Sequence, residues 1–235
     1  MKLNFGFGDE WKELKKFKKL TDKERSIVFY SENESYTVHF EKLIKELTNV
    51  HRLTVCYVTS SKDDPILNSS NTKILSFYIG DGAARTDFFI NLKADILVMT
   101  MPDLQTFHIK RSKVHNVHYV YIFHSMVSTH MIYRKNAFDN FDTIFCVGKH
   151  HVNEISKNEK KYHLPSKKLV EFGYGKLEQL MTKVEKNSEI KSTKKNNRTV
   201  LVAPSWGANG LIETRGDQII QTLLDSGYDV ILRPH

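Results

Sequence analysis

Hydrophobic and polar positions along the chain follow two alternating patterns. Short runs rich in β-branched and aromatic residues predict strands, and apolar residues at helical spacing lie between several of them. The predicted strands are 26–30, 53–58, 73–79, 95–100, 117–123, 143–147 and a short extended piece at 168–172, and the predicted helices are 36–47, 88–93, 149–160 and 176–184. Because this alternation is typical of a parallel sheet covered on both faces, residues 26–186 are predicted to form a Rossmann-like α/β domain.

A second α/β pattern begins after a polar segment at 187–198, whose Lys, Ser and Asn content is typical of a linker. Strand 199–203, loop 204–211, helix 215–224 and strand 228–232 follow, so residues 199–235 are predicted to start a second Rossmann-like domain. One βαβ piece cannot bury both faces of a sheet. We therefore expect the chain to be the front part of a two-domain protein.

Residues 1–25 are predicted to form a basic amphipathic helix or tail. Trp11, Leu14, Phe17 and Leu20 fall on roughly one stripe, with lysines elsewhere on the helix. Such a helix is suited to an anionic membrane surface. It is equally suited to covering one edge of the domain, so both interpretations stay open here.

Composition narrows the classes of partner. The chain has 235 residues, a formal charge of +8 and a pI near 9.3, which favours anionic partners such as phosphates or an acidic membrane surface. We find neither a long apolar span nor a signal-peptide core, so a cytoplasmic location is expected. Cys56 and Cys146 sit inside apolar runs, which predicts buried thiols rather than a disulfide or metal site.

Candidate catalytic and binding residues lie where predicted strands end. His124 follows the strand 117–123 directly, and Ser125, Ser128 and His130 come soon after it. Ligands of open α/β sheets bind beyond the carboxyl ends of the strands, so the first polar residue after a central strand is well placed for catalysis. Neutral imidazole can accept a proton near neutral pH, which makes His124 the predicted general base.

Positive charge close in sequence to this histidine suggests anion binding. Lys110, Arg111 and Lys113 precede the strand 117–123 and are predicted to bind an anionic acceptor, although such a basic run is often only a solvated face. The turn at 80–85 resembles the start of a dinucleotide-binding loop, but Arg85 replaces its third glycine. We therefore predict a tight strand-to-helix turn there, and phosphate binding by its exposed amides stays open as the alternative.

Four segments carry a resemblance to a known family. HSMVSTH (124–130), FDTIFCVGKHHVNEI (141–155), VAPSW (202–206) and ILRPH (231–235), in this order and at these separations, resemble the CDP-glycerol glycerophosphotransferases that build teichoic-acid-like and capsular polymers. The match covers roughly 26–235. It implies a glycosyltransferase-B architecture of two facing Rossmann-like domains, with a CDP-alditol donor held mainly by the second.

The resemblance also implies an activity and a place of action. Family members transfer glycerol phosphate to a hydroxyl of a lipid-linked acceptor at the inner face of the cell membrane, releasing CMP. In the family a glycine commonly follows the base histidine, whereas Ser125 follows His124 here, which leaves the acceptor undefined. No cofactor is implied.

Residues of the second α/β unit would serve the donor. Arg233 and His235 follow a predicted strand and are expected to neutralise the donor pyrophosphate opposite His124. Ser205, Trp206 and Gly207 lie in a loop whose backbone amides are suited to the same group. Because most of that domain is missing, we expect the 235-residue chain to bind CDP-glycerol weakly and not to catalyse transfer.

Other functions remain open. A nucleotide-sugar glycosyltransferase or epimerase on the same fold is the nearest alternative, and a non-catalytic module that docks the acceptor or the membrane is a second. The histidines lack the spacing of a zinc protease, so a metal site is not expected. We recognise no motif that reads nucleic acid, so no nucleic-acid partner is expected.

Overall fold

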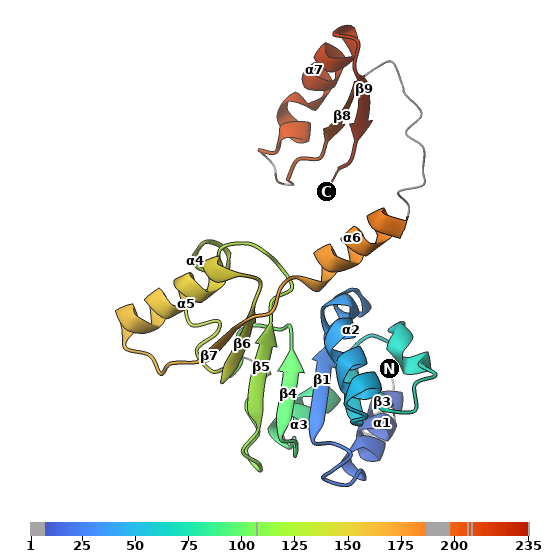
Figure 1. Cartoon of the computed structure of the whole chain (residues 1–235), viewed down its shortest axis with the longest axis vertical. Helices are drawn as coiled ribbons and strands as arrows, with labels where there is room; N and C mark the ends of the chain where they lie inside the picture. Colours follow the sequence, from blue (N-terminus) through green and yellow to red (C-terminus); the bar gives the residue numbers. More distant parts are fainter. Residues whose placement is uncertain (1–7, 107, 187–197, 206, 208, 235) are drawn as a thin grey trace, which may run out of the picture. The chain divides into compact units, whose positions relative to one another are not determined.

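The computed structural model describes residues 8–106, 108–186, 198–205, 207 and 209–234. The chain divides into two compact units, residues 1–184 and 185–235 (Figure 1). No helix within the described ranges combines the length and the apolar composition needed to span a bilayer.

A parallel sheet of seven strands forms the centre of the first unit. Its order is β3-β2-β1-β4-β5-β6-β7, which confirms the prediction of a Rossmann-like α/β sheet. The order reverses between β1 and β4, and this is the position where such sheets bind ligands. The strands are β1 (Ile27–Ser31), β2 (Val55–Thr59), β3 (Ile74–Tyr78), β4 (Ile96–Met99), β5 (His118–Ile122), β6 (Thr143–Cys146) and β7 (Lys168–Glu171).

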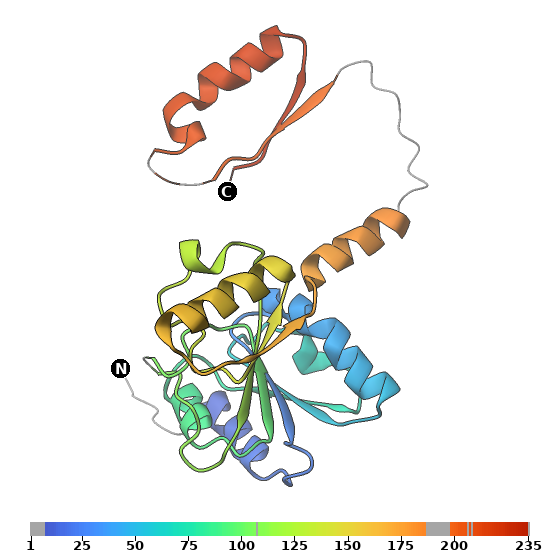
Figure 2. The same cartoon turned by 60° about the vertical axis from the view of Figure 1, so that its left-hand side comes forward.

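Helices cover both faces of this sheet (Figure 2). Alternate strand residues point to opposite faces, so Val28 and Tyr30 join one buried cluster and Phe29 joins the other. Helices α1, α3 and α5 pack on the first cluster and α2 on the second. The helices are α1 (Asp9–Lys18), α2 (Thr37–Lys45), α3 (Ala83–Ile90), α4 (Thr129–Ile132), α5 (Lys149–Tyr162) and α6 (Gly175–Lys186), with shorter helical turns at Glu34–Tyr36, Glu46–Val50 and Pro65–Asn68.

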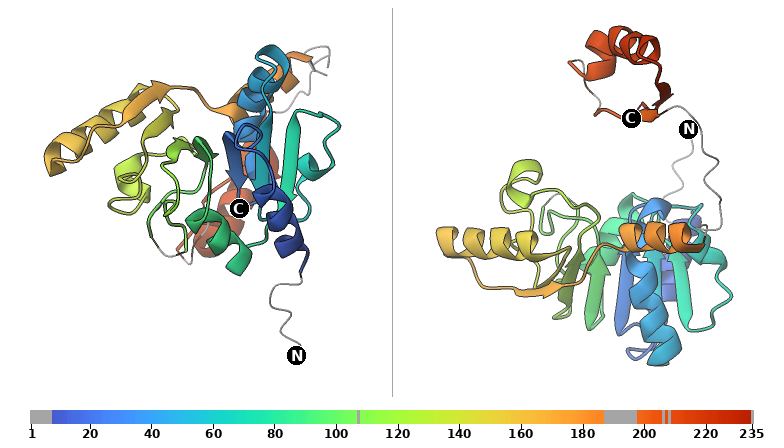
Figure 3. Two further views of the ribbon diagram at one scale, coloured as in Figure 1. Left: turned by 90° about the horizontal axis from the view of Figure 1, so that it is seen from below. Right: turned by 45° about the horizontal axis from the view of Figure 1, so that its top comes forward.

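The N-terminal helix belongs to the core of the first unit. Leu14 and Phe17 of α1 are only 1% and 3% exposed, and the Phe17 ring meets Phe77 and Phe88 edge to face. Figure 3 shows α1 at the β3 end of the sheet, far from β7 and α5. The edge-covering interpretation is therefore confirmed. The apolar side chains of this stripe pack against the sheet, so membrane binding through α1 stays an untested prediction.

Two helices begin earlier than their patterns suggest. Helix α3 starts at Ala83, right after the turn that contains Gly80 at φ +62° and Gly82, so Arg85 lies in the first helical turn. In the second unit, α7 (Leu211–Asp225) starts after Gly210 rather than near Arg215. Helix boundaries are the least certain part of a prediction from periodicity.

The second unit consists of α7 and two parallel strands, β8 (Thr199–Val202) and β9 (Asp229–Leu232). Leu201 is 60% exposed and Ile231 is 55% exposed. The predicted linker at 187–198 lies almost wholly outside the described residues. Within the described ranges, this unit presents apolar strand residues that it does not bury.

Both cysteines match their predicted environment. Cys56 and Cys146 are free and buried, and burial raises the pKa of each thiol to about 12. Neither is therefore a reactive thiolate at neutral pH.

Replacing Phe17 by Ala should lower the free energy of unfolding of the first unit by about 3–5 kcal/mol, because the truncation leaves a cavity between α1 and the sheet. Chemical denaturation followed by circular dichroism measures this loss. Lys15→Ala on the exposed face of the same helix is the control and should change stability by less than about 0.5 kcal/mol. Equal stability of Phe17→Ala and wild type would show that α1 does not contribute to the core.

Candidate active site

His124 stands just past the end of β5, at the carboxyl edge of the sheet. Its Nδ1 is 3.0 Å from the carbonyl oxygen of Thr100, which follows the neighbouring strand β4. A carbonyl oxygen only accepts hydrogen bonds, so Nδ1 carries the proton of the neutral ring. Nε2 then has a free lone pair, and it has no hydrogen-bond partner among the described residues.

Aromatic rings surround this imidazole. Tyr36 meets it edge to face at a centroid distance of 5.1 Å, and Tyr133 does so at 6.4 Å. The Tyr121 hydroxyl lies 3.4 Å from Nδ1, and the Tyr174 hydroxyl donates to the His124 carbonyl oxygen at 3.0 Å. Burial lowers the pKa of His124, an effect that the bond to Thr100 only partly opposes. The ring is therefore neutral at pH 7 and able to accept a proton through Nε2.

His39 is a second histidine at this edge, and sequence reasoning missed it. It projects from α2, is 4% exposed, and lies 5.3 Å from the Tyr174 ring between centroids. Its buried Nδ1 has no hydrogen-bond partner among the described residues. Burial, followed by repulsion from His124, lowers the pKa of His39 to about 4. A polar residue inside the apolar stripe of 36–47 was the signal that could have identified it.

Glu32 and Arg85 form a third group that sequence reasoning did not single out as a site. Glu32 directly follows β1, and burial raises the pKa of its carboxyl, opposed by the charge of Arg85. The carboxyl also acts electrostatically on Tyr36 and Tyr121, both of which contact His124. The rule that selected His124, a polar residue right after a buried strand, also applies to Glu32.

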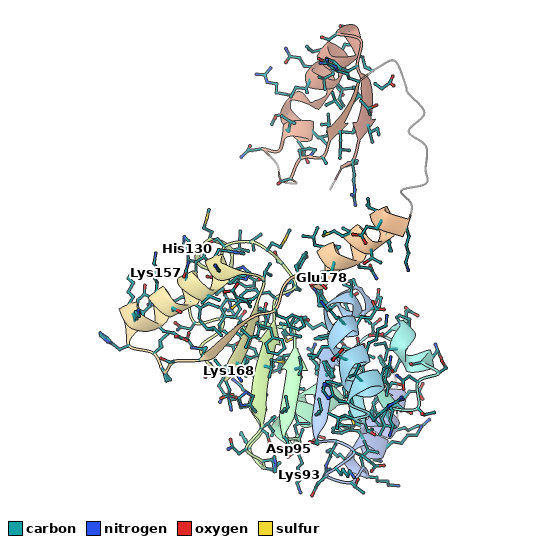
Figure 4. All side chains as sticks on the ribbon, viewed as in Figure 1. Lys93, Asp95, His130, Lys157, Lys168 and Glu178 are labelled. Atoms are coloured by element: carbon teal, nitrogen blue, oxygen red, sulfur yellow. The ribbon has the colours of Figure 1, made fainter. Side chains whose placement is uncertain are left out.

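Ser125, Ser128 and His130 lie near His124 in sequence, but two of them are held by Glu154 of α5. The Ser128 hydroxyl donates to Glu154 at 2.9 Å and lies 2.9 Å from Nδ1 of His130, which is labelled in Figure 4. The Ser125 hydroxyl accepts from the amide of Val127 at 3.4 Å. These contacts shape the loop after β5, so substrate binding by these residues stays a prediction.

Glu154 also fixes the start of α4. Its carboxylate accepts hydrogen bonds from the amide and hydroxyl of Thr129, at 2.6 and 2.7 Å. Burial raises the pKa of Glu154, but hydrogen bonds from Thr129 and Ser128 outweigh this effect and lower it overall. The carboxylate therefore stays charged at neutral pH and stabilises the helix N-terminus.

Two histidines of α5 contact the backbone of the loop that follows β5. His151 is fully buried against the Phe123 ring, and its Nε2 donates to the Val127 carbonyl oxygen at 2.9 Å. His150 approaches the Met126 carbonyl oxygen through Nε2 at 3.3 Å. The paired histidines found in the sequence thus position the segment that follows His124.

A cavity of about 240 Å³ opens between α4, α5 and the loop 133–139. His130, Lys135 and Glu154 contribute polar groups to its lining. Tyr133 lines the cavity and also contacts His124, so the cavity lies next to the histidine. His124 itself does not line this cavity.

The structure does not bring the basic segment before β5 to His124. Arg111 forms two hydrogen bonds to Asp142, at 3.3 and 3.0 Å, and donates to the Val117 carbonyl oxygen at 3.0 Å, at the amino end of β5. Its guanidinium lies over the Tyr119 ring, 4.5 Å from the centroid. The backbone amide of Lys113 donates to Ile90 at the end of α3, near the amino edge that Asp95 marks in Figure 4.

Arg111 and Lys113 therefore lie at the edge of the sheet opposite to His124. Lys110 donates through Nζ to the Gln105 carbonyl oxygen at 2.8 Å, within the loop that leads to that edge. Through the hydrogen bonds of Arg111 to Val117 and Asp142, this segment stabilises the start of β5, and it lies away from His124.

The predicted donor residues of the second unit follow its two strands. Arg233 comes right after β9, and its amide donates to Val202 at the end of β8 at 2.9 Å. Ser205 and Gly207 lie in the loop before α7, and Gly207 has φ +140°. The Glu213 carboxylate lies close to Gly210 at the start of α7. Trp206 and His235 lie outside the described residues.

Comparison of the sequence with known protein-family models finds no match, and a search of curated proteins finds none either. The fold and the geometry around His124 therefore supply the functional argument. Together they give a parallel α/β sheet with a neutral histidine and a half-buried carboxyl that follow strands at its carboxyl edge.

Lowering the pH from 6.5 to 4 should destabilise the first unit by about 3 kcal/mol through His39. The unfolded chain binds a proton at His39 near pH 6.5, whereas the folded chain does so only at about pH 4, so stability falls as the pH drops through this window. Urea denaturation at a series of pH values measures the slope. His39→Gln should remove this part of the slope, and an unchanged slope would contradict the buried neutral state of His39.

Proposed function

We propose that this chain belongs to a transferase and that its first unit binds the acceptor. The enzyme moves glycerol phosphate, or a related alditol phosphate, from a CDP-activated donor to a hydroxyl of a lipid-linked cell-envelope or capsular polymer. The observation that carries the proposal is the neutral His124, whose tautomer is fixed by Thr100 and whose Nε2 is free. The resemblance of segments 124–130, 141–155, 202–206 and 231–235 supplies the substrate class.

The chemical step requires one proton acceptor and compensation of phosphate charge. Nε2 of His124 takes the proton of the acceptor hydroxyl as its oxygen attacks the phosphorus that bears the glycerol. The new oxygen–phosphorus bond forms, the bond to the bridging oxygen breaks, and CMP leaves with that oxygen. Phosphoryl transfer needs little covalent work from the protein beyond positioning and charge stabilisation.

The second unit is the proposed donor side of a glycosyltransferase-B enzyme. Arg233 follows β9 closely, and its guanidinium is suited to a pyrophosphate. The loop before α7 ends at Gly210, where the helix N-terminus offers free backbone amides. Glu213 lies at the same helix start and opposes anion binding there, so we assign the larger role to Arg233.

A lipid-linked acceptor calls for a membrane-facing surface, and we place it at the loop after β5. Met131 and Ile132 of α4 are 74% and 66% exposed, and Met126 is 50% exposed. Lys149, which is exposed, begins α5 next to His150, and His150 contacts the Met126 carbonyl oxygen, so positive charge lies close to these apolar residues. Exposed apolar side chains beside a cation fit the interface of an anionic bilayer. This location would keep the polymer end beside His124.

Replacing His124 by Ala should lower the rate of CMP release from CDP-glycerol by about 10²–10⁴-fold, because the base is lost. The assay supplies a lipid-linked acceptor. His115→Ala, an exposed histidine near the amino edge of the sheet, is the matched control and should retain full activity.

Three outcomes would change this proposal. Near-normal CMP release by His124→Ala removes the residue from the mechanism. Turnover of UDP-sugars in place of CDP-glycerol favours a glycosyltransferase or epimerase on the same fold. No turnover of either donor favours a docking module without catalysis.

Replacing Met131 and Ile132 by Asp should weaken sedimentation with phosphatidylglycerol vesicles by at least about fivefold, since two exposed apolar side chains are lost from the interface. Wild-type binding should fall with added salt and with phosphatidylcholine in place of phosphatidylglycerol. Met181→Asp is the control, because Met181 on α6 is 55% exposed but outside this loop. Equal binding to neutral and anionic vesicles would reject the membrane surface.

A further inference from the structure

The strap, residues 172–175, joins β7 to α6 and crosses the carboxyl edge of the sheet. The backbone amides of Phe172 and Gly173 donate to the Cys146 carbonyl oxygen at the end of β6, at 2.8 and 3.3 Å. The strap then reaches α2, beside which α6 begins (Figure 1, Figure 3). It therefore passes over the same edge at which His124 lies.

Two glycines give the strap its path. Gly173 has φ +93°, a conformation that residues with a side chain rarely adopt. Gly175 lies so close to α2 that a Cβ atom there would be 2.8 Å from the Val38 carbonyl oxygen and 3.5 Å from the Cα atom of His39. A side chain at this position would therefore push the strap away from α2.

Tyr174, between these glycines, contacts both α2 and His124. Its ring packs against the buried His39, with 5.3 Å between the ring centroids, and its hydroxyl donates to the His124 carbonyl oxygen at 3.0 Å. The imidazole end of His124 is held by the Thr100 carbonyl oxygen, which lies 3.0 Å from Nδ1. The histidine is thus fixed at its backbone and at its ring, so the direction of Nε2 is fixed as well.

We propose that Tyr174 is a positioning residue for His124. Its hydrogen bond holds the backbone of His124 in the orientation in which Nδ1 reaches Thr100. Since the bond made by one ring nitrogen decides which nitrogen carries the proton, loss of the Tyr174 hydroxyl lets the ring turn and mixes the two tautomers. The lone pair of Nε2 then points toward the acceptor in only part of the molecules. The effect on turnover rests on the proposed function, whereas the effect on the ring needs no substrate.

Tyr174→Phe removes the hydroxyl and keeps the ring. The ¹⁵N chemical shifts of the His124 ring, measured without substrate and assigned with His124→Ala, should move from those of one tautomer toward the average of two. The kcat for CMP release from CDP-glycerol should fall about tenfold, equivalent to about 1.4 kcal/mol or one net hydrogen bond. KM should change by less than about twofold, because a misdirected base slows the chemical step and not binding.

Gly175→Ala tests the same contact by a different route. This variant keeps the Tyr174 hydroxyl but displaces the strap from α2, so it should change the His124 shifts in the same direction. Tyr78→Phe removes a hydroxyl from β3 at the opposite end of the strand order, and as the matched control it should alter neither the shifts nor kcat. Circular dichroism verifies that each variant is folded.

The readouts separate this inference from the proposed function. Unchanged His124 shifts in Tyr174→Phe, or a kcat equal to that of wild type, would overturn the inference and leave His124 as the base. A wild-type protein that releases no CMP would count against the proposed function, while the ring shifts would still decide whether Tyr174 positions His124.

Discussion

The reversal of strand order between β1 and β4 is the constraint on which the candidate site depends. Connections that leave two neighbouring parallel strands in opposite directions open the sheet edge between them. Glu32, Thr100 and His124 follow β1, β4 and β5, which are consecutive in the sheet. Because β4 ends at Met99, the Thr100 carbonyl oxygen is free to accept from His124. The chemistry of the edge thus follows from where the strands stop.

Burial among aromatic rings then sets the charge states of this edge. Desolvation disfavours the charged form of every group, so it lowers the pKa of His124 and His39 and raises that of Glu32. A neutral imidazole with a bare Nε2 is suited to accept one proton. Groups whose pKa values are displaced in opposite directions are typical of sites that transfer protons.

The strands and the base candidate could be predicted from sequence because each depends on local pattern. Apolar runs located every strand of the first unit within a few residues, and His124 was found as the polar residue ending one run. The same rule applied to β1 would have found Glu32. The sequence predicted α1 as a helix but not what its apolar stripe packs against, because an amphipathic stripe looks the same whether it packs on a sheet or on a bilayer.

Other residues required the three-dimensional arrangement. Arg111 is close to His124 in the sequence and was therefore expected near it. The loop from β4, however, returns to the amino edge of the sheet before β5 begins, and Arg111 lies there. Ser128 and His130 looked free in the sequence, but Glu154, a partner more than twenty residues away, engages both. The sequence shows His39 only as a polar residue inside an apolar stripe, and its place beside Tyr174 follows from the packing of α2.

The tautomer of His124 tests the central claim most directly. Nitrogen chemical shifts of ¹⁵N-labelled histidine, measured at pH 7 and assigned with His124→Ala, report which ring nitrogen holds the proton. The account predicts a neutral ring with the proton on Nδ1, bonded to the Thr100 carbonyl oxygen, and a bare Nε2. A proton on Nε2, or a doubly protonated ring at that pH, would contradict the role of His124 as the acceptor-activating base.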